Sequence, residues 1–236
     1  NLSRRWSHVR IAERSLTSVK PAKPELKIDW ATHEAARFAC ENWHYSRCLP
    51  AGKLVKVGAW EDGKFIGVVL FGRGASPTLG TKFSLGQEEC VELVRISLRQ
   101  HETAVSRIAA IAMRFLKKSN EGLRLVVSFA DPDKGHHGGI YQAGNWVYCG
   151  KSPATKELFI DGRWVHWRGG FYQKDATTPQ RIMEGKHRYL MPLDAEMRDR
   201  IKPLARPYPK RAGSDTKDTA DVQSAEGGST PTPALQ

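Results

Sequence analysis

The sequence lacks two features that mark membrane-inserted or exported proteins. No run of about 18 apolar residues, the length that a helix needs to cross a bilayer, occurs in the 236 residues. The segment Asn1–Ser15 carries charges where a signal peptide needs an apolar stretch. We therefore expect no membrane partner and a cytoplasmic location.

Cysteine is also scarce and scattered. The four cysteines form no C-x-x-C pair, so neither a zinc knuckle nor a dense disulfide framework is indicated: Cys40, Cys48, Cys90 and Cys149. Reduced and partly buried thiols are the simpler interpretation. The adjacent His136 and His137 point to different sides of the chain, and such a pair rarely shares a metal without other ligands. No metal site is predicted.

Acidic residues are too few to balance the basic ones. The chain has 25 Asp and Glu against 37 Lys and Arg, for a formal net charge of +12. Residues Arg206–Gln236 contain four basic and four acidic residues, so the whole net charge falls on the first 205 residues. A body this basic should attract a polyanion such as nucleic acid.

Composition divides the chain into three parts. Residues 1–26 are basic and contain Pro21 and Pro24, which is typical of an N-terminal arm. Residues 206–236 are rich in Gly, Ser, Thr, Asp and Pro without apolar periodicity, which predicts a disordered tail. Between them, residues 27–205 are apolar enough to build a core, and we expect a single α/β domain with a mixed central sheet.

Periodicity predicts alternating helices and strands in that domain. Helices are expected at 31–43, 105–116 and 139–146, and a last one capped by Asp194 through Ile201. A hairpin is expected at 53–60 and 65–72, with Asp62-Gly63 in its turn, and a second at 157–160 and 163–167 about Asp161-Gly162. Further strands are expected at 90–98, 123–130 and 146–150. The strand–helix–strand order of 90–130 predicts a right-handed crossover with parallel strands.

Three polar clusters interrupt these patterned elements, which is where function is often found. The first is Trp43–Arg47, which also suits an ordinary helix C-terminus. The second is Ser128–Asp133 at the carboxyl end of a buried strand, where open α/β sheets bind ligands, although Asp131 also suits a simple turn. The third surrounds Tyr141. Arg95 lies inside an apolar strand and needs an anionic partner if buried, or lies on an open face of the sheet.

The order of elements resembles the core of the GNAT acyltransferases. Tyr141, Gly144 and Trp146 resemble the end of that family's last core helix, where a tyrosine acts as general acid toward the departing thiolate. The family's phosphate-binding loop corresponds to Arg99–Ala104, with Glu102 in place of a glycine. A carboxylate there would oppose a pyrophosphate.

Four blocks in order resemble the Mom family of DNA-modification proteins from Mu-like bacteriophages. They are Trp43-His44-Tyr45-Ser46 with Pro50 and Gly52-Lys53, Glu92–Arg95, Ser128–Asp131, and Gly139–Ala143. The resemblance spans roughly residues 40 to 170. It implies conversion of DNA adenine to its N6-carbamoylmethyl derivative in the host cytoplasm, which protects phage DNA from host restriction.

The connectivity of that product constrains the donor. Simple acyl transfer attaches a carbonyl carbon to nitrogen, whereas the product has a methylene on the adenine nitrogen and an amide at its far end. A transferred glycyl group could rearrange through a five-membered spiro intermediate to give that order of atoms. The donor is thus expected to be glycyl-tRNA, or a coenzyme A thioester with a separate nitrogen source.

The resemblance and the chemistry together suggest roles for particular residues. The adenine amine is a poor nucleophile and needs a base, an oxyanion donor and close positioning. Asp131 is assigned as base and Tyr141 as acid or oxyanion donor, with His44 and Tyr45 as target-base or proton-relay groups. Arg95, Arg99 and Ser128 are assigned to the donor.

The expected partner is double-stranded DNA with the target adenine flipped out of the stack. The residues assigned to nucleic acid are Trp43, Arg47, Trp146 and the basic residues of the arm, Arg4, Arg5, Arg10, Arg14 and Lys20. Two alternatives stay open. The chain could be an ordinary GNAT N-acetyltransferase, or a non-catalytic basic protein that binds nucleic acid and yields no modified nucleoside.

Overall fold

The computed structural model describes residues 23–74, 78–167, 175 and 177–210. The chain divides into two compact units, Asn1–Arg124 and Leu125–Gln236. Both contain helices packed with antiparallel strands, so the predicted α/β class is confirmed. The expected parallel pairing of 90–98 with 123–130 would join the two units and stays a prediction. No helix within the described ranges is long and apolar enough to cross a membrane.

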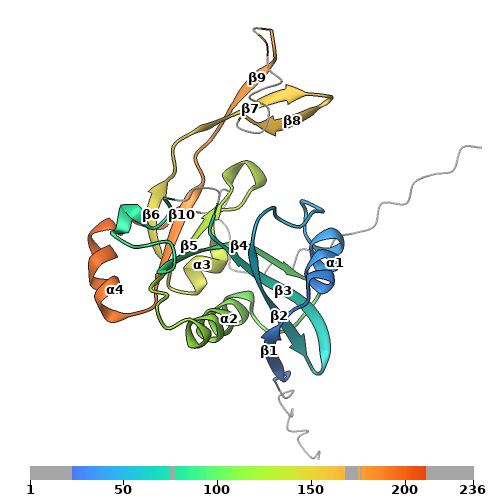
Figure 1. Cartoon of the computed structure of the whole chain (residues 1–236), viewed down its shortest axis with the longest axis vertical. Helices are drawn as coiled ribbons and strands as arrows, with labels where there is room; N and C mark the ends of the chain where they lie inside the picture. The colour runs from blue at the N-terminus through green and yellow to red at the C-terminus, as the bar shows by residue number, and fades with distance from the viewer. Residues whose placement is uncertain (1–22, 75–77, 168–174, 176, 211–236) are drawn as a thin grey trace, which may run out of the picture. The chain divides into compact units, whose positions relative to one another are not determined.

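Among the described residues of the first unit, antiparallel strands follow one another in chain order (Figure 1): β1 (Leu26–Trp30), β2 (Leu54–Glu61), β3 (Lys64–Gly72) and β4 (Cys90–Leu98). The predicted hairpin is β2–β3. Its turn places Asp62 at φ 49° and Gly63 at φ 75°, which are the left-handed conformations that an Asp-Gly pair tolerates. The strand β1 was not predicted, because its residues fall partly in the expected arm.

The part of this unit that the structure describes also contains the helices α1 (His33–Trp43) and α2 (Val105–Ser119) and a short 3-10 turn, η1 (Thr81–Phe83). Thr32 begins α1, since its Oγ1 accepts a hydrogen bond from the amide of Ala35 at 3.1 Å. Ala36 and Ala39 of α1 are fully buried and form one core cluster with Val68 and Leu70 of β3. The small side chains let the helix backbone approach the sheet closely. Both helices agree with their predicted ranges to within a few residues.

The second unit is built on the antiparallel order β5–β10–β6. These strands are β5 (Leu125–Ala130), β10 (His187–Pro192) and β6 (Val147–Lys151). The chain between β5 and β6 forms η2 (Pro132–Lys134) and α3 (Gly139–Ala143), and β10 is followed by α4 (Ala195–Ile201) and η3 (Lys202–Leu204). Asp194 caps α4 as predicted, accepting from the amide of Met197 at 2.7 Å. The strand β10 was not predicted.

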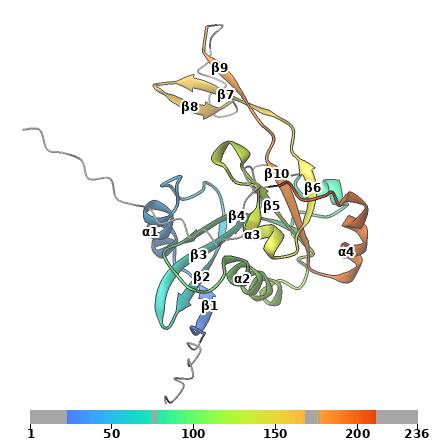
Figure 2. The same ribbon diagram turned by 180° about the vertical axis from the view of Figure 1, so that it is seen from behind.

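A small sheet in the order β8–β7–β9 lies between β6 and β10 in the chain. Its strands are β7 (Thr155–Ile160), β8 (Arg163–His166) and β9 (Gln180–Met183). Figures 1 and 2 both show it at the far end of an arm that leaves β6 and returns into β10. The hairpin β7–β8 was predicted and β9 was not.

The described chain continues past the boundary predicted for the tail. The amide of Arg206 donates to the Tyr148 carbonyl at 2.8 Å, and the Tyr208 hydroxyl donates to the Trp146 carbonyl at 2.7 Å. Residues 206–210 are therefore held against β6. The rest of the expected tail, like residues 1–22 of the expected arm, lies outside the described residues.

Candidate functional site

The predicted site residues fall into two groups, one in each unit. In the second unit, Ser128 on β5 and Tyr141 on α3 are joined by a hydrogen bond of 2.7 Å between their hydroxyl oxygens. Asp131 follows directly after β5. Its Oδ1 accepts the amide of Asp133 at 3.1 Å, which starts η2 at Pro132. The turn role considered for Asp131 is thus real, but it uses only one carboxylate oxygen.

The other oxygen of Asp131 is bound by a residue that sequence reasoning missed. Lys186 Nζ lies 3.1 Å from Oδ2, and the side chains of Lys186 and Asp131 are 49% and 17% exposed. Lys186 directly precedes β10, whose pairing places His187 opposite Ala130 and Tyr189 opposite Ser128. Because β10 lies beside β5, it supplies the second half of this site.

Aromatic rings hold Tyr141 in place. Its ring centroid lies 5.0 Å from that of Trp146 and 5.0 Å from that of Tyr189. The Tyr189 hydroxyl donates to the His137 carbonyl at 2.5 Å. Tyr189 also lies over Gly138, where an added Cβ would come within about 2.5 Å of the tyrosine ring. Gly138 has φ 86° and immediately precedes α3, so the tyrosine and the glycine together fix where that helix starts.

Burial sets the protonation of the groups beside this site. His187 is 8% exposed, and its Nδ1 lies 3.0 Å from the Tyr148 hydroxyl. Burial, together with the nearby Lys151 ammonium, lowers the pKa of His187 below its usual value. Burial raises the pKa of Tyr189. At neutral pH the imidazole is therefore uncharged and Tyr189 keeps its proton.

In the first unit, residues 43–47 form a compact turn after α1. His44 Nδ1 accepts the amide of Ser46 at 3.1 Å, and the rings of His44 and Tyr45 lie 4.2 Å apart. Arg47 Nη1 donates to the carbonyls of Asn42 and Glu41 at 2.8 and 3.2 Å. Arg47 thus serves the C-terminus of α1, which is the ordinary role considered for this cluster.

The two arginines assigned to the donor have partners within the first unit. Arg95 is half-buried and donates to the carbonyl of Cys48, so a backbone oxygen accepts from it rather than the anion expected for a buried Arg95. Burial raises the pKa of the nearby Cys40 thiol, although Arg95 acts in the opposite direction. The guanidinium of Arg99 lies 5.9 Å from the centre of the Trp43 ring.

The loop that resembles a coenzyme A loop is already bound to a carboxylate. Glu61 accepts the amides of Glu102 and Thr103 at 2.9 and 2.8 Å and the Thr103 hydroxyl at 2.6 Å. Burial alone would raise the pKa of Glu61, but these hydrogen bonds outweigh it and the pKa is lowered. With the Glu102 carboxylate beside it, this loop does not fit the pyrophosphate of coenzyme A.

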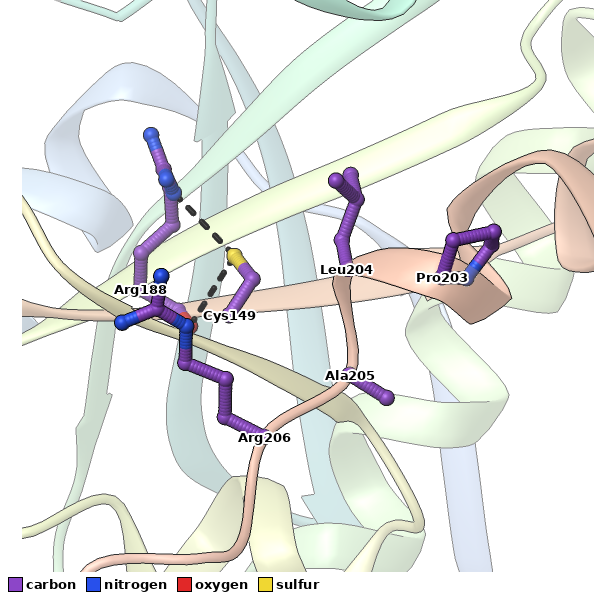
Figure 3. Close-up of a pocket in the computed structure, with 6 residues that line it drawn as sticks. All are labelled: Cys149, Arg188, Pro203, Leu204, Ala205 and Arg206. Carbon is purple, nitrogen blue, oxygen red and sulfur yellow. Dashed lines mark hydrogen bonds between the residues drawn. The ribbon is translucent and has the colours of Figure 1, made fainter.

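One pocket of the second unit has a volume of about 200 Å³. Its lining is shown in Figure 3 and consists of Cys149, Arg188, Pro203, Leu204, Ala205 and Arg206. Arg188 Nε donates to the Cys149 sulfur at 3.1 Å. Ligand pockets typically measure about 300–1,000 Å³. The volume of this one lies below that range, so it does not fit a whole cofactor.

Some predicted residues cannot be placed. Arg4, Arg5, Arg10, Arg14 and Lys20 lie outside the described residues. Among the residues that the structure does describe, no three His, Cys, Asp or Glu side chains are grouped so that they could hold a metal ion.

Fold and site together define an α/β protein in which acid–base side chains gather at the carboxyl end of a strand. The chain belongs to the Mom protein family, whose model matches residues 25–210. It is similar to the methylcarbamoylase mom of Escherichia phage Mu, with 24% identity over 204 residues, 79% of this chain and 84% of the relative.

Solved structures with a more distant likeness include two proteins. An Acinetobacter baylyi protein titled as an acetyltransferase is 12% identical, covers 80% of this chain and 100% of its own, and has a TM-score of 0.41. The AHL synthase LasI is 10% identical, covers 79% and 100%, and has a TM-score of 0.40.

Proposed function

We propose that this chain is a phage enzyme that modifies DNA, converting adenine to its N6-carbamoylmethyl derivative and so protecting phage DNA from host restriction. Its membership of the Mom family and its similarity to a methylcarbamoylase support an enzyme of this kind. The observation that carries the proposal is the grouping at the end of β5, where a hydroxyl pair, Ser128 and Tyr141, shares a unit with the ion pair of Asp131 and Lys186. The enzyme would work in the host cytoplasm on double-stranded DNA with the adenine flipped out.

The reaction proceeds in two stages in this proposal. The adenine amine attacks the carbonyl carbon of a glycyl ester, and the ester alcohol leaves. The glycyl amine then attacks the purine carbon that bears the new amide, forming a five-membered spiro ring. Cleavage of the bond between that carbon and the original amine leaves a methylene on the ring-bound nitrogen and a terminal amide.

Residues of both units have proposed roles in these stages. Asp131, held by Lys186, takes the proton from the adenine amine, and Tyr141, fixed by Ser128, donates a hydrogen bond to the oxyanion. His44 and Tyr45 would position the target base or relay a proton, and Trp43 offers a half-buried ring on which a base can stack. Trp146, predicted for the same role, is only 2% exposed and packs against Tyr141 instead, so it is not available for stacking. Arg95, Arg99 and Ser128 remain the candidates for holding the donor.

The donor is proposed to be glycyl-tRNA rather than a coenzyme A thioester. Glu61 and Glu102 place negative charge on the loop where coenzyme A would put its pyrophosphate. A glycyl ester also supplies the nitrogen that the product requires, with no second nitrogen source.

The test is mass spectrometry of nucleosides from DNA of cells that express the chain. The wild type should yield N6-carbamoylmethyladenine. Asp131→Asn and Tyr141→Phe should lower the yield per folded molecule by about two to four powers of ten, as expected on loss of a general acid or base. Asp133→Asn is the matched control, because this exposed carboxylate is two residues away, and it should retain the product.

Each alternative gives a different result. An N-acetylated small molecule or protein with unmodified DNA would identify an ordinary GNAT N-acetyltransferase. DNA binding without any modified nucleoside would identify a non-catalytic protein. Near-normal yield from both site variants would remove Asp131 and Tyr141 from the mechanism even if the wild-type product were confirmed.

A further inference from the structure

The small sheet β8–β7–β9 has one face that carries aromatic and cationic side chains. Strand pairing sets Phe159 opposite Trp164, and Glu157 opposite both His166 and Arg181. Because side chains alternate along a strand, these five residues share one face, which we call the aromatic face. Ile182, next to Arg181 in β9, is on the opposite face.

The side chains of the aromatic face are organised by their own contacts. The rings of Phe159 and Trp164 lie 5.2 Å apart. The Arg181 guanidinium lies 4.4 Å from the centre of the Trp164 ring, and Glu157 binds its Nη2 and Nε at 2.6 and 2.9 Å. The result is a stack of two rings, inclined at 57° to each other, and a guanidinium, held in place by one carboxylate.

This stack remains open to solvent. Phe159 is 39% exposed and Trp164 is 38% exposed, whereas Leu158, which directly precedes Phe159 and is on the other face, is only 5% exposed. A sheet with strands of four to six residues has little core of its own, and folding alone would favour turning the rings inward. Exposed aromatic side chains grouped in this way indicate a binding surface.

We propose that the aromatic face docks DNA beside the target adenine, with bases stacking on Trp164 and Phe159. This inference rests on the proposed function for its choice of DNA. Flat rings and a guanidinium suit nucleic-acid bases of any sequence, because every base presents a π face. Flipping one adenine leaves its neighbours without a stacking partner, which a ring from the protein can replace.

Charge and connectivity support the same partner. Residues 155–186 contain six basic and four acidic residues, in a chain whose net charge is +12. The small sheet is continuous in the chain with the candidate site. Its strand β9 leads through Lys186, the partner of Asp131, into β10. DNA held on the aromatic face is therefore bound by a segment that leads directly into β10, one of the strands beside the candidate site.

The experiment measures the affinity of the full chain for a labelled DNA duplex by fluorescence anisotropy. Trp164→Ala should weaken binding by about 5- to 150-fold, the range for loss of one base–aromatic stack. Arg181→Gln should weaken it in the same direction, and Trp164→Phe should restore most of the affinity because it keeps a ring. Ile182→Thr is the matched control. It removes a side chain that is 66% exposed on the opposite face and should bind like the wild type.

Three results would overturn the inference. The first is wild-type affinity for DNA in both Trp164→Ala and Arg181→Gln. The second is a loss of affinity in Ile182→Thr equal to the loss in Trp164→Ala. The third is binding to anionic phospholipid vesicles that depends on Trp164 while the affinity for DNA does not. Thermal unfolding of each variant separates lost binding from lost folding. The proposed function is tested apart from this: affinity that depends on Trp164 in a protein that makes no modified adenine would keep the docking surface and reject the reaction.

Discussion

At the scale of single residues, His187 illustrates how burial decides protonation. Its ring lies at the start of β10 against Tyr148, and its pKa is lowered by burial and by Lys151. The unfolded chain therefore binds a proton at a higher pH, near the usual value of about 6.5, than the folded chain does. As pH falls through 6.5, protons bind the unfolded state preferentially, and stability declines until the folded pKa is passed.

This linkage predicts a measurable difference between the wild type and His187→Gln. Between pH 7 and pH 5 the melting temperature of the wild type should fall further than that of the variant, because only the wild type contains this imidazole. The measurement is thermal unfolding by circular dichroism across that range. Parallel pH curves for the two proteins would show that His187 is not linked to folding.

Lys186 is the residue-scale feature that sequence reasoning could not supply. Ser128, Asp131 and Tyr141 stand within fourteen residues of one another, around the end of an apolar strand that could be recognised. Lys186 comes 55 residues after Asp131, in a charged segment that resembles a loop. Only the pairing of β10 with β5 brings it to Asp131.

At the scale of elements, the entry into α3 depends on a glycine. Gly135 and Gly138 both have positive φ, at 72° and 86°. A Cβ on Gly135 would meet nothing within 4 Å, whereas one on Gly138 would meet the ring of Tyr189. The two positions therefore separate backbone strain from steric overlap.

Gly135→Ala should lower the free energy of unfolding by about 1–2 kcal/mol, from left-handed strain alone. Gly138→Ala should cost roughly 1–3 kcal/mol more, because Tyr189 must move to make room. Denaturant unfolding of both variants measures the difference. Equal losses of unfolding free energy in the two variants would mean that Tyr189 moves aside without destabilising the fold.

The elements that were predicted share a strong local signal. The helix α2 has a clean apolar stripe, and both hairpins have an Asp-Gly turn. The missed strands lack such signals. β1 follows Pro24 and contains Lys27 and Asp29, and β10 begins with charged and polar residues before Leu190. These strands form because a neighbouring strand offers backbone partners, which composition does not reveal.

At the scale of the whole molecule, the end of the described chain is part of the second unit. Arg206 and Tyr208 donate hydrogen bonds to backbone carbonyls of Tyr148 and Trp146. The predicted boundary at Arg206 therefore assigns to the tail residues that are hydrogen-bonded to the domain. Trp146 also packs against Tyr141, so residues 206–210 contact a residue that supports the candidate site.

Two truncations test this placement. Removal of residues 211–236 should leave the melting temperature and the yield of modified adenine unchanged. Removal of 206–236 should lower stability by about 1–3 kcal/mol, from the two lost hydrogen bonds and the lost packing of Tyr208. Differential scanning calorimetry and nucleoside analysis compare them. Identical behaviour of the two truncated chains would show that residues 206–210 contribute nothing.

The four thiols differ greatly in accessibility. Cys40, Cys90 and Cys149 are buried and Cys48 is exposed, and burial raises the pKa of Cys90 to about 12. A maleimide reagent at neutral pH should therefore attach to Cys48 alone, without any engineered substitution. Cys48 lies directly after the turn of residues 43–47, so a spin label or fluorophore there would report on that turn while DNA or an acyl donor is titrated in.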